Sequence, residues 1–443
     1  MNRRSAAVAA SCVILLLAGS AHADVVTDWN TAALDAIKAA PPGPPAAARA
    51  LAMMHTAMYD ANNAITHAGR SYSSMPTAPT TADRQCAVAQ SAHDVLVSLF
   101  PTQAAALDAR LAAELQSVPV GLARTQGLSV GVEVAANFVS MRASDGSSGP
   151  NPWQQGHAST SWQPTGPLQA PQFNQYAKTT PWTMSSPSMF RAGPPPLPGS
   201  AAFQTAYDEV KAFGAANSAV RTEDQTNIAK YWAGGGGTVT PPGQWNLIAQ
   251  TVAISHNTTV DDELRLFAQL NLAAADAAIA AWDMKLYYDY FRPITAIRAS
   301  DDPTWTPLLA TPQFQSYSSG HSLFSAASAA VLASFFGDST PFSLTLSDPS
   351  LGFTDMTRSF SSFSQAAEEA GQSRIYGGIH WQFDNQASLD AGVRAWRIHR
   401  CELCADSLAG RGVDAVVCVV GRGAAAPPRL MRLTHGRADP RGG

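Results

Sequence analysis

Apolar residues along the chain recur with the spacing of helices, and the alternation that marks strands is scarce. Alanine and leucine dominate the apolar positions, and both favour helices. Between breaks rich in proline or glycine, the pattern predicts helices over residues 29–39, 45–64, 82–99, 103–143, 202–217, 221–232, 245–257, 260–291, 321–336, 361–374 and 384–398. The expected fold class is therefore all-α.

Two irregular stretches interrupt this helical pattern. Residues 144–200 are rich in Ser, Gly, Pro and Trp, which in a compact protein is more typical of an ordered covering loop than of a linker. Residues 233–244 (AGGGGTVTPPGQ) contain a glycine run without the Gly-Lys-Ser/Thr ending that phosphate-binding loops require. A structural loop is therefore expected at this second stretch.

The first 23 residues have the three parts of a secretory signal peptide. Arg3 and Arg4 supply the positive end, residues 12–18 the apolar run, and residues 21–23 (AHA) a small-residue cleavage site. The apolar run is too short for a good membrane span. We expect cleavage after Ala23, a periplasmic or extracellular location, and no stable membrane insertion afterwards.

The composition suits one large core or two coupled helical regions. The 443 residues are 46% hydrophobic, and the formal net charge is −4. This charge gives no general attraction to nucleic acid, so an anion site has to come from a local cluster of cations. The expected organisation is a signal peptide (1–23), an N-terminal helical region (24–200) and a C-terminal helical region (201–399), followed by an atypical segment (400–443).

Residues 400–443 differ in composition from the rest of the chain. This segment holds three of the five cysteines, arginine without lysine, and an end rich in Pro and Gly. A disordered tail and an out-of-frame C-terminus both explain it. The pair Cys401-x-x-Cys404 lacks the second pair or the histidines that a zinc site needs.

Three short segments carry candidate chemistry, and the first is Lys285-LYYDYF-Arg292-Pro293. Residues seven apart lie two turns along one helix face, so both cations can reach one anion. Lysine supplies a point charge and arginine a planar fork that matches two oxygens. Two solvated surface cations would have the same spacing.

The second segment is Ser319-Gly320-His321, directly before an apolar helix. The first N–H groups of a helix and its dipole bind anions, and Ser319 adds a hydroxyl. His321 can donate or accept a proton. An ordinary helix cap beside an exposed histidine is the alternative.

The third segment is Ser373-Arg374-IYGGI-His380-WQF-Asp384. Arg374 adds a second fork, and the Gly377-Gly378 pair permits a close backbone approach. His380 has a nitrogen that can bond to phosphorus or a metal, and Asp384 can orient its imidazole. The alternative is a helix-end histidine packed on a tryptophan.

In this order and with these spacings, the three segments resemble the signature of the vanadium-dependent haloperoxidase and PAP2-type acid phosphatase superfamily. The flanking sequence resembles its bacterial haloperoxidase-like branch over most of residues 29–398. One departure is Ser318, where the family usually has proline. We expect a softer loop there, without loss of a ligand.

The resemblance implies an all-helical fold of paired helical bundles, with an oxyanion held at the end of one bundle. It implies a cradle for the oxygens of vanadate or phosphate made by Lys285, Arg292, Ser319, the N–H of Gly320, and Arg374. His380 would bind vanadium directly or attack phosphorus, Asp384 would support it, and His321 would act as general acid and base.

The resemblance leaves two activities open. As a haloperoxidase, the protein would use vanadate as a Lewis acid to activate hydrogen peroxide, with Lys285 polarising the bound oxygen and His321 taking a proton, so that a halide leaves as hypohalous acid. As a soluble periplasmic acid phosphatase, it would form a phosphohistidine from a phosphomonoester at His380. Trp282 and Phe314 match residues on the halide side of chloroperoxidase-type members and favour the first activity, although such residues commonly belong to a core.

A protein that only captures phosphate or vanadate is a third interpretation. The presence of both His321 and His380 argues against it, because capture alone needs neither an acid nor a nucleophile. A homodimer is a further open expectation.

Overall fold

The computed structural model describes residues 24–74 and 76–403. The prediction of a signal peptide over residues 1–23 lies outside the described residues, as does the tail prediction from residue 404 onward. The all-α expectation is confirmed, because thirteen α-helices and a single two-stranded sheet make up the regular structure of the described residues.

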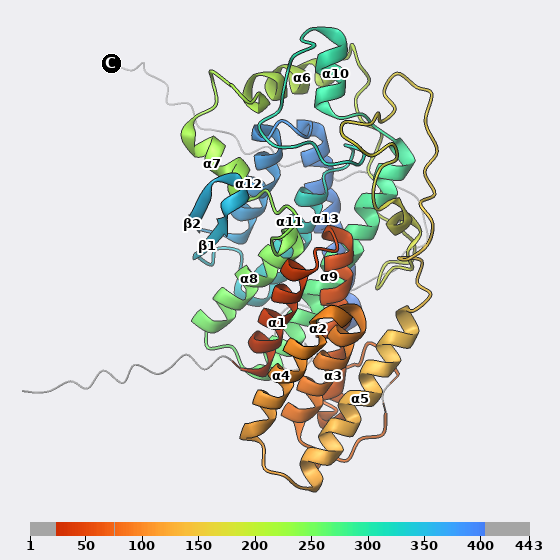
Figure 1. The fold of residues 1–443 in the computed structure, drawn as a ribbon, viewed down its shortest axis with the longest axis vertical. Coiled ribbons are helices and arrows are strands. Elements are labelled where there is room, and N and C mark those ends of the chain that lie inside the picture. Colours follow the sequence, from red (N-terminus) through yellow and green to blue (C-terminus); the bar gives the residue numbers. More distant parts are fainter. Residues whose placement is uncertain (1–23, 75, 404–443) are drawn as a thin grey trace, which may run out of the picture. The chain divides into compact units, whose positions relative to one another are not determined.

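The helices follow one another along the chain, and the longest irregular connection joins α5 to α6 (Figure 1). Their bounds are α1 (Val25–Ala39), α2 (Pro44–Thr66), α3 (Arg84–Leu99), α4 (Ala104–Glu114), α5 (Leu122–Arg142), α6 (Ala201–Gly214), α7 (Glu223–Tyr231), α8 (Thr240–Ser255), α9 (Val260–Tyr288), α10 (Pro293–Ser300), α11 (Gly320–Phe336), α12 (Phe363–Tyr376) and α13 (Gln382–Leu403).

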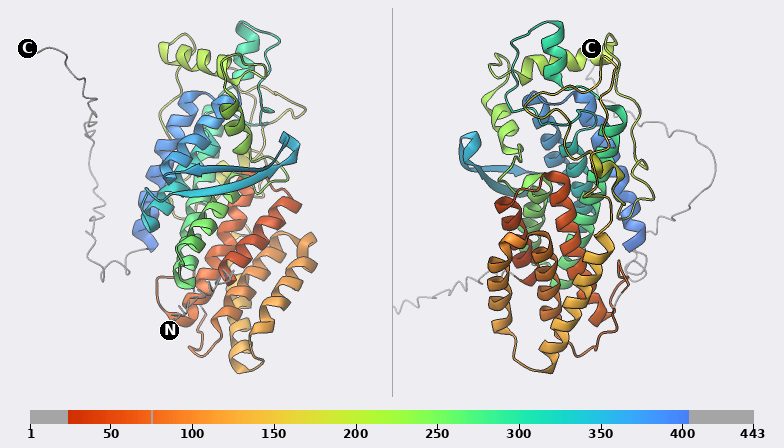
Figure 2. Two further views of the ribbon diagram at one scale, coloured as in Figure 1. Left: turned by 90° about the vertical axis from the view of Figure 1, so that its left-hand side faces the viewer. Right: turned by 45° about the vertical axis from the view of Figure 1, so that its right-hand side comes forward.

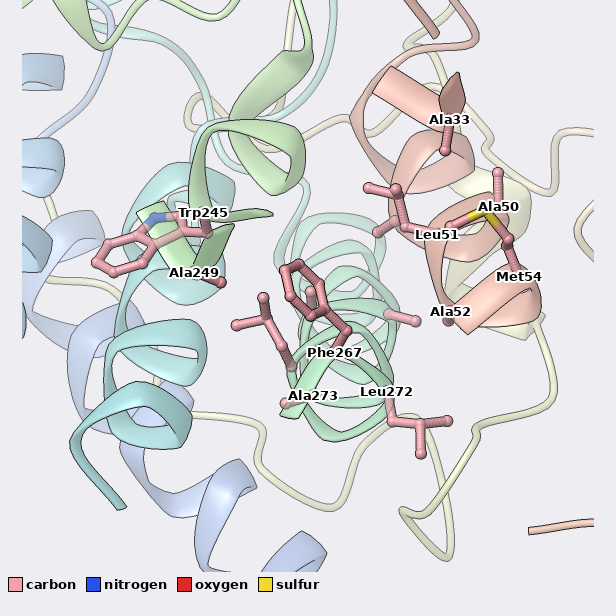
Figure 3. Packing of buried hydrophobic residues seen from close by; sticks show 14 of the residues in the cluster. Ala33, Ala50, Leu51, Ala52, Met54, Trp245, Ala249, Phe267, Leu272 and Ala273 are labelled. Carbon is pink, nitrogen blue, oxygen red and sulfur yellow. The ribbon is translucent and has the colours of Figure 1, made fainter. Parts of the chain in front are cut away.

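The long helix α9 is shared between two groups of helices. It packs on α2, which contacts α3 and α5, and it also packs on α11, which contacts α12 and α13. Trp245, Phe267 and Leu51, from α8, α9 and α2, belong to the main core cluster (Figure 3). This arrangement fits the expected paired bundles and puts the C-terminal end of α9 close to the start of α11.

Helix α9 is the one helix in the described part of the chain that is long and apolar enough to cross a membrane. However, 94% of its most apolar window is buried inside the protein, as in the core helix of a globular fold. The helix begins after Thr259, whose side chain accepts from the N–H of Asp262, and it is capped after Tyr288 by Asp289, which adopts a left-handed conformation.

Two predicted helix boundaries were wrong. Residues 103–143 were expected to be helical throughout, but α4 ends at Glu114 and α5 begins only at Leu122, because Pro119 and Gly121 interrupt the segment. The helix predicted over 260–291 stops at Tyr288, and Pro293 begins the separate helix α10 at its first position.

The loop predicted over residues 233–244 was also too long. Helix α8 starts at Thr240, with Pro241 and Pro242 in its first turn, where a missing N–H costs nothing. Residues 144–200 contain neither an α-helix nor a strand, only the 3-10 turn Asn174–Lys178. Asp276 of α9 anchors this segment by accepting from the N–H groups of Trp182 and Thr183 at 2.7 and 2.8 Å.

The sequence pattern did not predict the antiparallel hairpin of β1 (Phe342–Asp348) and β2 (Phe353–Phe360). Figure 2 shows it as a ribbon that extends outward from the helices. Phe342 and Leu344 are buried, while Ser343 between them and Thr345 after them are exposed. The turn of the hairpin lies beside the functional site described next.

Candidate functional site

The structure brings the three candidate segments together around the C-terminal end of α9 and the N-terminal end of α11. Lys285 is in the last turn of α9, and Arg292 caps α10. Ser319 caps α11, Arg374 is in the last turn of α12, and His380 lies in the turn before α13. Helices distant in sequence therefore converge on one small volume.

Lys285 is completely buried and fixes the segment that leads into α11. Its Nζ donates to the carbonyl oxygens of Gln315, Ser316 and Ser318, at 2.8, 3.1 and 2.5 Å. Burial, with Arg292 acting in the same direction, lowers the pKa of Lys285 well below its usual value. The charge of Asp384 acts in the opposite direction but does not outweigh them.

Arg292 is equally buried and spans two parts of the site. Its Nε donates to the carbonyl of Phe314 at 2.7 Å, and its Nη1 donates to the carbonyl of Ile379 at 2.6 Å and to Nε2 of His380 at 3.0 Å. In the part of the chain that the structure describes, Nη2 is buried and has no hydrogen-bond partner. Burial lowers the pKa of Arg292 to about 9.

Arg374 is the third buried cation. Its Nε donates to the hydroxyl of Ser373 at 2.9 Å, and its Nη2 donates to the carbonyl of Ala229 at 3.1 Å. Burial lowers its pKa to about 9, and the nearby charge of Arg292 contributes to the shift. Arg292 is therefore near enough for its charge to disfavour the charged form of Arg374.

His380 is oriented by a carboxylate and a guanidinium. Its Nδ1 is 2.8 Å from Oδ2 of Asp384, and its Nε2 is the atom that accepts from Arg292. These partners assign the proton to Nδ1 and the lone pair to Nε2. Burial first, and then the neighbouring cations, lower the pKa of His380 well below its usual value, which keeps that lone pair available.

Asp384 is the acceptor for several donors at once. Its Oδ2 also accepts from the hydroxyl of Ser316 and from the N–H of Trp381. Burial raises the pKa of Asp384 to about 6, against the opposing effect of these hydrogen bonds and of the cations. Among the described residues, Asp384 is the one carboxylate whose charge acts on the pKa of Lys285 and Arg292.

The N-terminus of α11 faces the same site. The hydroxyl of Ser319 accepts from the N–H of Ser322 at 3.3 Å and from its hydroxyl at 2.9 Å, as a helix cap does. Gly320 is the first residue of the helix, where an N–H has no carbonyl partner within the helix. This end of α11 therefore presents donors and the positive end of the helix dipole.

His321 lies on the side of the site that opens into a cavity. Its Nε2 donates to the carbonyl of Ala233 at 3.2 Å, which leaves the lone pair on Nδ1. Burial, and then the charge of Arg374, lower the pKa of His321 well below its usual value. A neutral imidazole of this kind can take a proton from a bound acid.

Aromatic rings form one wall of the site. The centroids of Trp282 and Phe314 are 5.4 Å apart, and Nζ of Lys285 is 5.8 and 5.1 Å from these two rings. A third ring, that of Phe173, lies 6.0 Å from Trp282 and 6.4 Å from Phe314. Next to this wall opens a cavity of about 610 Å³, whose lining includes His321 and Arg374.

Sequence reasoning missed two contributors to the site. Phe173 lies in the irregular segment 144–200, which gives no local signal of a site, and Ser316 was not singled out within its segment. The Gly377-Gly378 pair does allow a close approach, but to protein: a Cβ atom at Gly378 would lie 2.3 Å from the carbonyl oxygen of Gly214. Gly378 thus allows close packing against the end of α6, and a Cβ atom at Gly377 would lie 2.8 Å from Leu309.

The arrangement as a whole carries excess positive charge. The site contains two buried guanidinium groups and the buried amine of Lys285, but one buried carboxylate, that of Asp384. Both histidines have lowered pKa values, which favours their neutral forms. Buried charge without a partner is costly, so an anion is the expected occupant. The forks of Arg292 and Arg374 and the helix N-terminus suit a tetrahedral or trigonal-bipyramidal oxyanion.

Comparisons with known proteins agree with this chemistry. Residues 265–395 match the family described as the VCPO second helical-bundle domain, and this span holds every candidate site residue from Trp282 to Asp384. Vanadium chloroperoxidase of Curvularia inaequalis is 27% identical over 281 residues, which cover 48% of this chain. The match spans 46% of that protein, so this chain corresponds to about half of the fungal enzyme.

Solved structures extend the likeness to most of the chain. The first bacterial vanadium-dependent iodoperoxidase superposes with a TM-score of 0.77 and 25% identity, covering 86% of this chain and 96% of that one. The apo form of a bacterial vanadium-dependent chloroperoxidase has the same fold, with a TM-score of 0.67, 18% identity, and coverage of 82% and 96%. Together, the match to the helical bundle that carries the site, the fungal relative and the iodoperoxidase structure support a likeness of this chain to the vanadium haloperoxidase superfamily.

Proposed function

We propose that this protein is a vanadium-dependent haloperoxidase, which uses hydrogen peroxide to oxidise a halide to hypohalous acid. The observation that carries the proposal is the buried cluster of Lys285, Arg292 and Arg374 beside the His380–Asp384 pair. The haloperoxidase relatives favour this activity over the acid phosphatase that the signature alone leaves open.

Vanadate fits the residues that are present. The three cations have one buried carboxylate as counter-charge, Nη2 of Arg292 lacks a partner in the described structure, and Nε2 of His380 bears a lone pair. Vanadate would be held by Lys285, Arg292, Arg374, Ser319, the N–H of Gly320, and His380 as the metal ligand. When bound, it would supply a Lewis acid that activates peroxide without changing its oxidation state.

The protein's own groups then have separate tasks. Asp384 keeps the proton of His380 on Nδ1, so that Nε2 points its lone pair into the site. His321, neutral because of its lowered pKa, takes a proton from incoming hydrogen peroxide through Nδ1. Lys285 places a positive charge where negative charge develops on the reacting oxygen.

The aromatic wall suits the halide. Trp282 and Phe314 surround the approach to Lys285 with apolar surface, and a weakly hydrated anion gives up water there more easily than a phosphoester. We propose that the halide approaches along this wall. Export with cleavage after Ala23, proposed from the signal-peptide pattern, would deliver the enzyme outside the cytoplasm.

The test is halogenation of monochlorodimedone by protein first stripped of bound oxyanions. Turnover with bromide or iodide and peroxide should appear on addition of vanadate, and His380→Ala should abolish it while the circular dichroism spectrum stays unchanged. Hydrolysis of p-nitrophenyl phosphate that vanadate inhibits, without any halogenation, would assign the same residues to a phosphatase instead.

A further inference from the structure

A second cavity, of about 340 Å³, adjoins the glycine run that follows α7. Side chains of α1, α7 and α8, the glycine run itself and both strands of the hairpin line it. It shares Gly234 and Asp348 with the cavity beside the aromatic wall, but none of the residues of the proposed vanadate site lines it. It is therefore a separate space, which the halide reaction does not use.

Gln244 brings an unused hydrogen-bond acceptor to this second cavity. The residue is 3% exposed, and its Nε2 donates to the carbonyl of Tyr231 at 3.2 Å. That bond fixes which end of the side-chain amide is the oxygen. The oxygen, Oε1, is buried and has no hydrogen-bond partner among the described residues. Because a buried polar atom without a partner is costly, Oε1 needs a donor, and a ligand in the cavity can supply one.

The charged groups of the lining have both signs. Lys230, in the last turn of α7, forms no ion pair within the described part of the chain. Lys38 pairs with Asp35 at 3.0 Å, but both are exposed, which makes such a pair weak. On the hairpin, Asp348 uses Oδ1 to accept from the N–H and the hydroxyl of Ser350, which leaves Oδ2 for a ligand. Two lysines and one carboxylate favour a ligand that carries both charges over a simple anion.

Apolar side chains complete the lining. Leu247 of α8, Leu346 of β1 and Phe353 of β2 are half-buried and border the cavity. An aliphatic group of a ligand would remove part of their apolar surface from water. The volume lies near the lower end of the range of roughly 300–1,000 Å³ that is typical of sites for small molecules. The lining therefore suits a small ligand with an aliphatic part.

We infer that this second cavity binds an α-amino acid with an aliphatic side chain, such as leucine. The carboxylate of the ligand pairs with Lys230, and its ammonium group donates to Oε1 of Gln244 and to Oδ2 of Asp348. The aliphatic side chain packs on Leu346 and Phe353. Binding needs neither vanadate nor peroxide, so the inference stands apart from the proposed function.

Three ligands of similar size test which charges the cavity recognises. In isothermal titration, L-leucine should bind to one site per chain. 4-Methylpentanoate lacks the ammonium group and 3-methylbutylamine lacks the carboxylate, so each should bind at least about tenfold more weakly than leucine. Added phosphate should leave the affinity for leucine unchanged, because phosphate is expected in the cation cluster and not in this cavity.

Two lysine variants test the place of binding. Lys230→Met removes the charge but keeps an unbranched side chain, and it should weaken leucine binding by at least about tenfold. Lys178→Met, at an exposed position outside this cavity, is the matched control and should bind leucine as the wild type does. Circular dichroism spectra show whether both variants are folded.

The outcomes separate this inference from the proposed function. Absence of leucine binding, or 4-methylpentanoate that binds as tightly as leucine, would overturn an amino-acid site. Displacement of leucine by phosphate would put the ligand in the cation cluster and would overturn the inference too, as would wild-type affinity in Lys230→Met. None of these results bears on whether the cation cluster binds vanadate.

Discussion

His380 donates its Nδ1 proton to Oδ2 of Asp384 across 2.8 Å, and both residues belong to the turn that begins α13. The carboxylate is itself fixed by the hydroxyl of Ser316 and the N–H of Trp381. The ring orientation of His380 is thus set by two segments of the chain, residues 381–384 and the segment that contains Ser316, and its Nε2 lies toward Arg292 with a lone pair.

Changing this carboxylate should weaken vanadate binding. In Asp384→Asn the neutral amide no longer fixes the proton on Nδ1, so the affinity for vanadate should fall by about 10–100-fold, as for other changes to groups behind a metal ligand. Isothermal titration of the stripped protein with vanadate measures this. Asp390→Asn, at an exposed position of the same helix, is the matched control and should bind normally.

Occupancy of the site should change the titration of His321. Burial and the charge of Arg374 lower its pKa, so in the stripped protein the imidazole should stay neutral well below pH 6.5. A bound oxyanion offsets the cations, which favours the imidazolium form and raises the pKa. Histidine Cε1–H resonances followed by NMR against pH, with and without phosphate, measure the shift.

The exposed His157 provides the control for this titration, because its resonance should not respond to phosphate. A curve for His321 that phosphate leaves unchanged would argue that the oxyanion does not bind beside it.

The close contact between Gly43 and Phe173 should be intolerant of a side chain. Gly43 has φ of +83°, and an added Cβ would lie 2.4 Å from the ring of Phe173. Gly43→Ala should therefore lower the free energy of unfolding by about 1–3 kcal/mol. Urea denaturation measures this. Gly121→Ala, where no atom lies within 4 Å of the added Cβ, should change stability far less.

The buried carboxyl group of Glu263, at the other end of α9 from the site, should make the free energy of unfolding decrease at high pH. Burial, with a hydrogen bond to Asp24, raises the pKa of Glu263 to about 9 from 4.5. The folded protein then holds a proton that the unfolded chain releases, so this group's contribution is complete below pH 4.5 and is lost as the pH rises through about 9.

Glu263→Gln removes this proton linkage but keeps the shape of the side chain. The stability of the variant relative to the wild type should rise with pH between 4.5 and about 9, by at most about 1.4 kcal/mol per pH unit. Thermal unfolding over this range measures the difference. A difference that does not vary with pH would contradict a protonated Glu263.

Most helices could be predicted from the sequence because their apolar faces repeat over long stretches. The hairpin was missed although residues 342–348 (FSLTLSD) alternate apolar and polar positions, since the helical pattern on both sides dominated the interpretation. The break between α4 and α5 depends on Pro119 and Gly121, which are weak signals inside an alanine-rich segment.

The candidate site residues could be proposed from the sequence because side-chain types at fixed spacings resemble a family signature, and the structure brings them together. What the spacing could not give is the set of contacts made through the backbone, such as the three carbonyls that hold Lys285 and the carbonyl of Ala233 that holds His321. Phe173 reaches the site from an irregular segment. Its position depends on packing against Gly43, which no local pattern records.

The most direct test of the central claim is the binding of vanadate to the stripped protein, measured by isothermal titration with phosphate as competitor. The account predicts one site per chain, competition by phosphate, and loss of binding in His380→Ala and in Arg374→Ala while the variants remain folded. A folded wild-type protein that binds no vanadate, or that binds it equally well in both variants, would contradict the assignment of this buried cation cluster as the vanadate site.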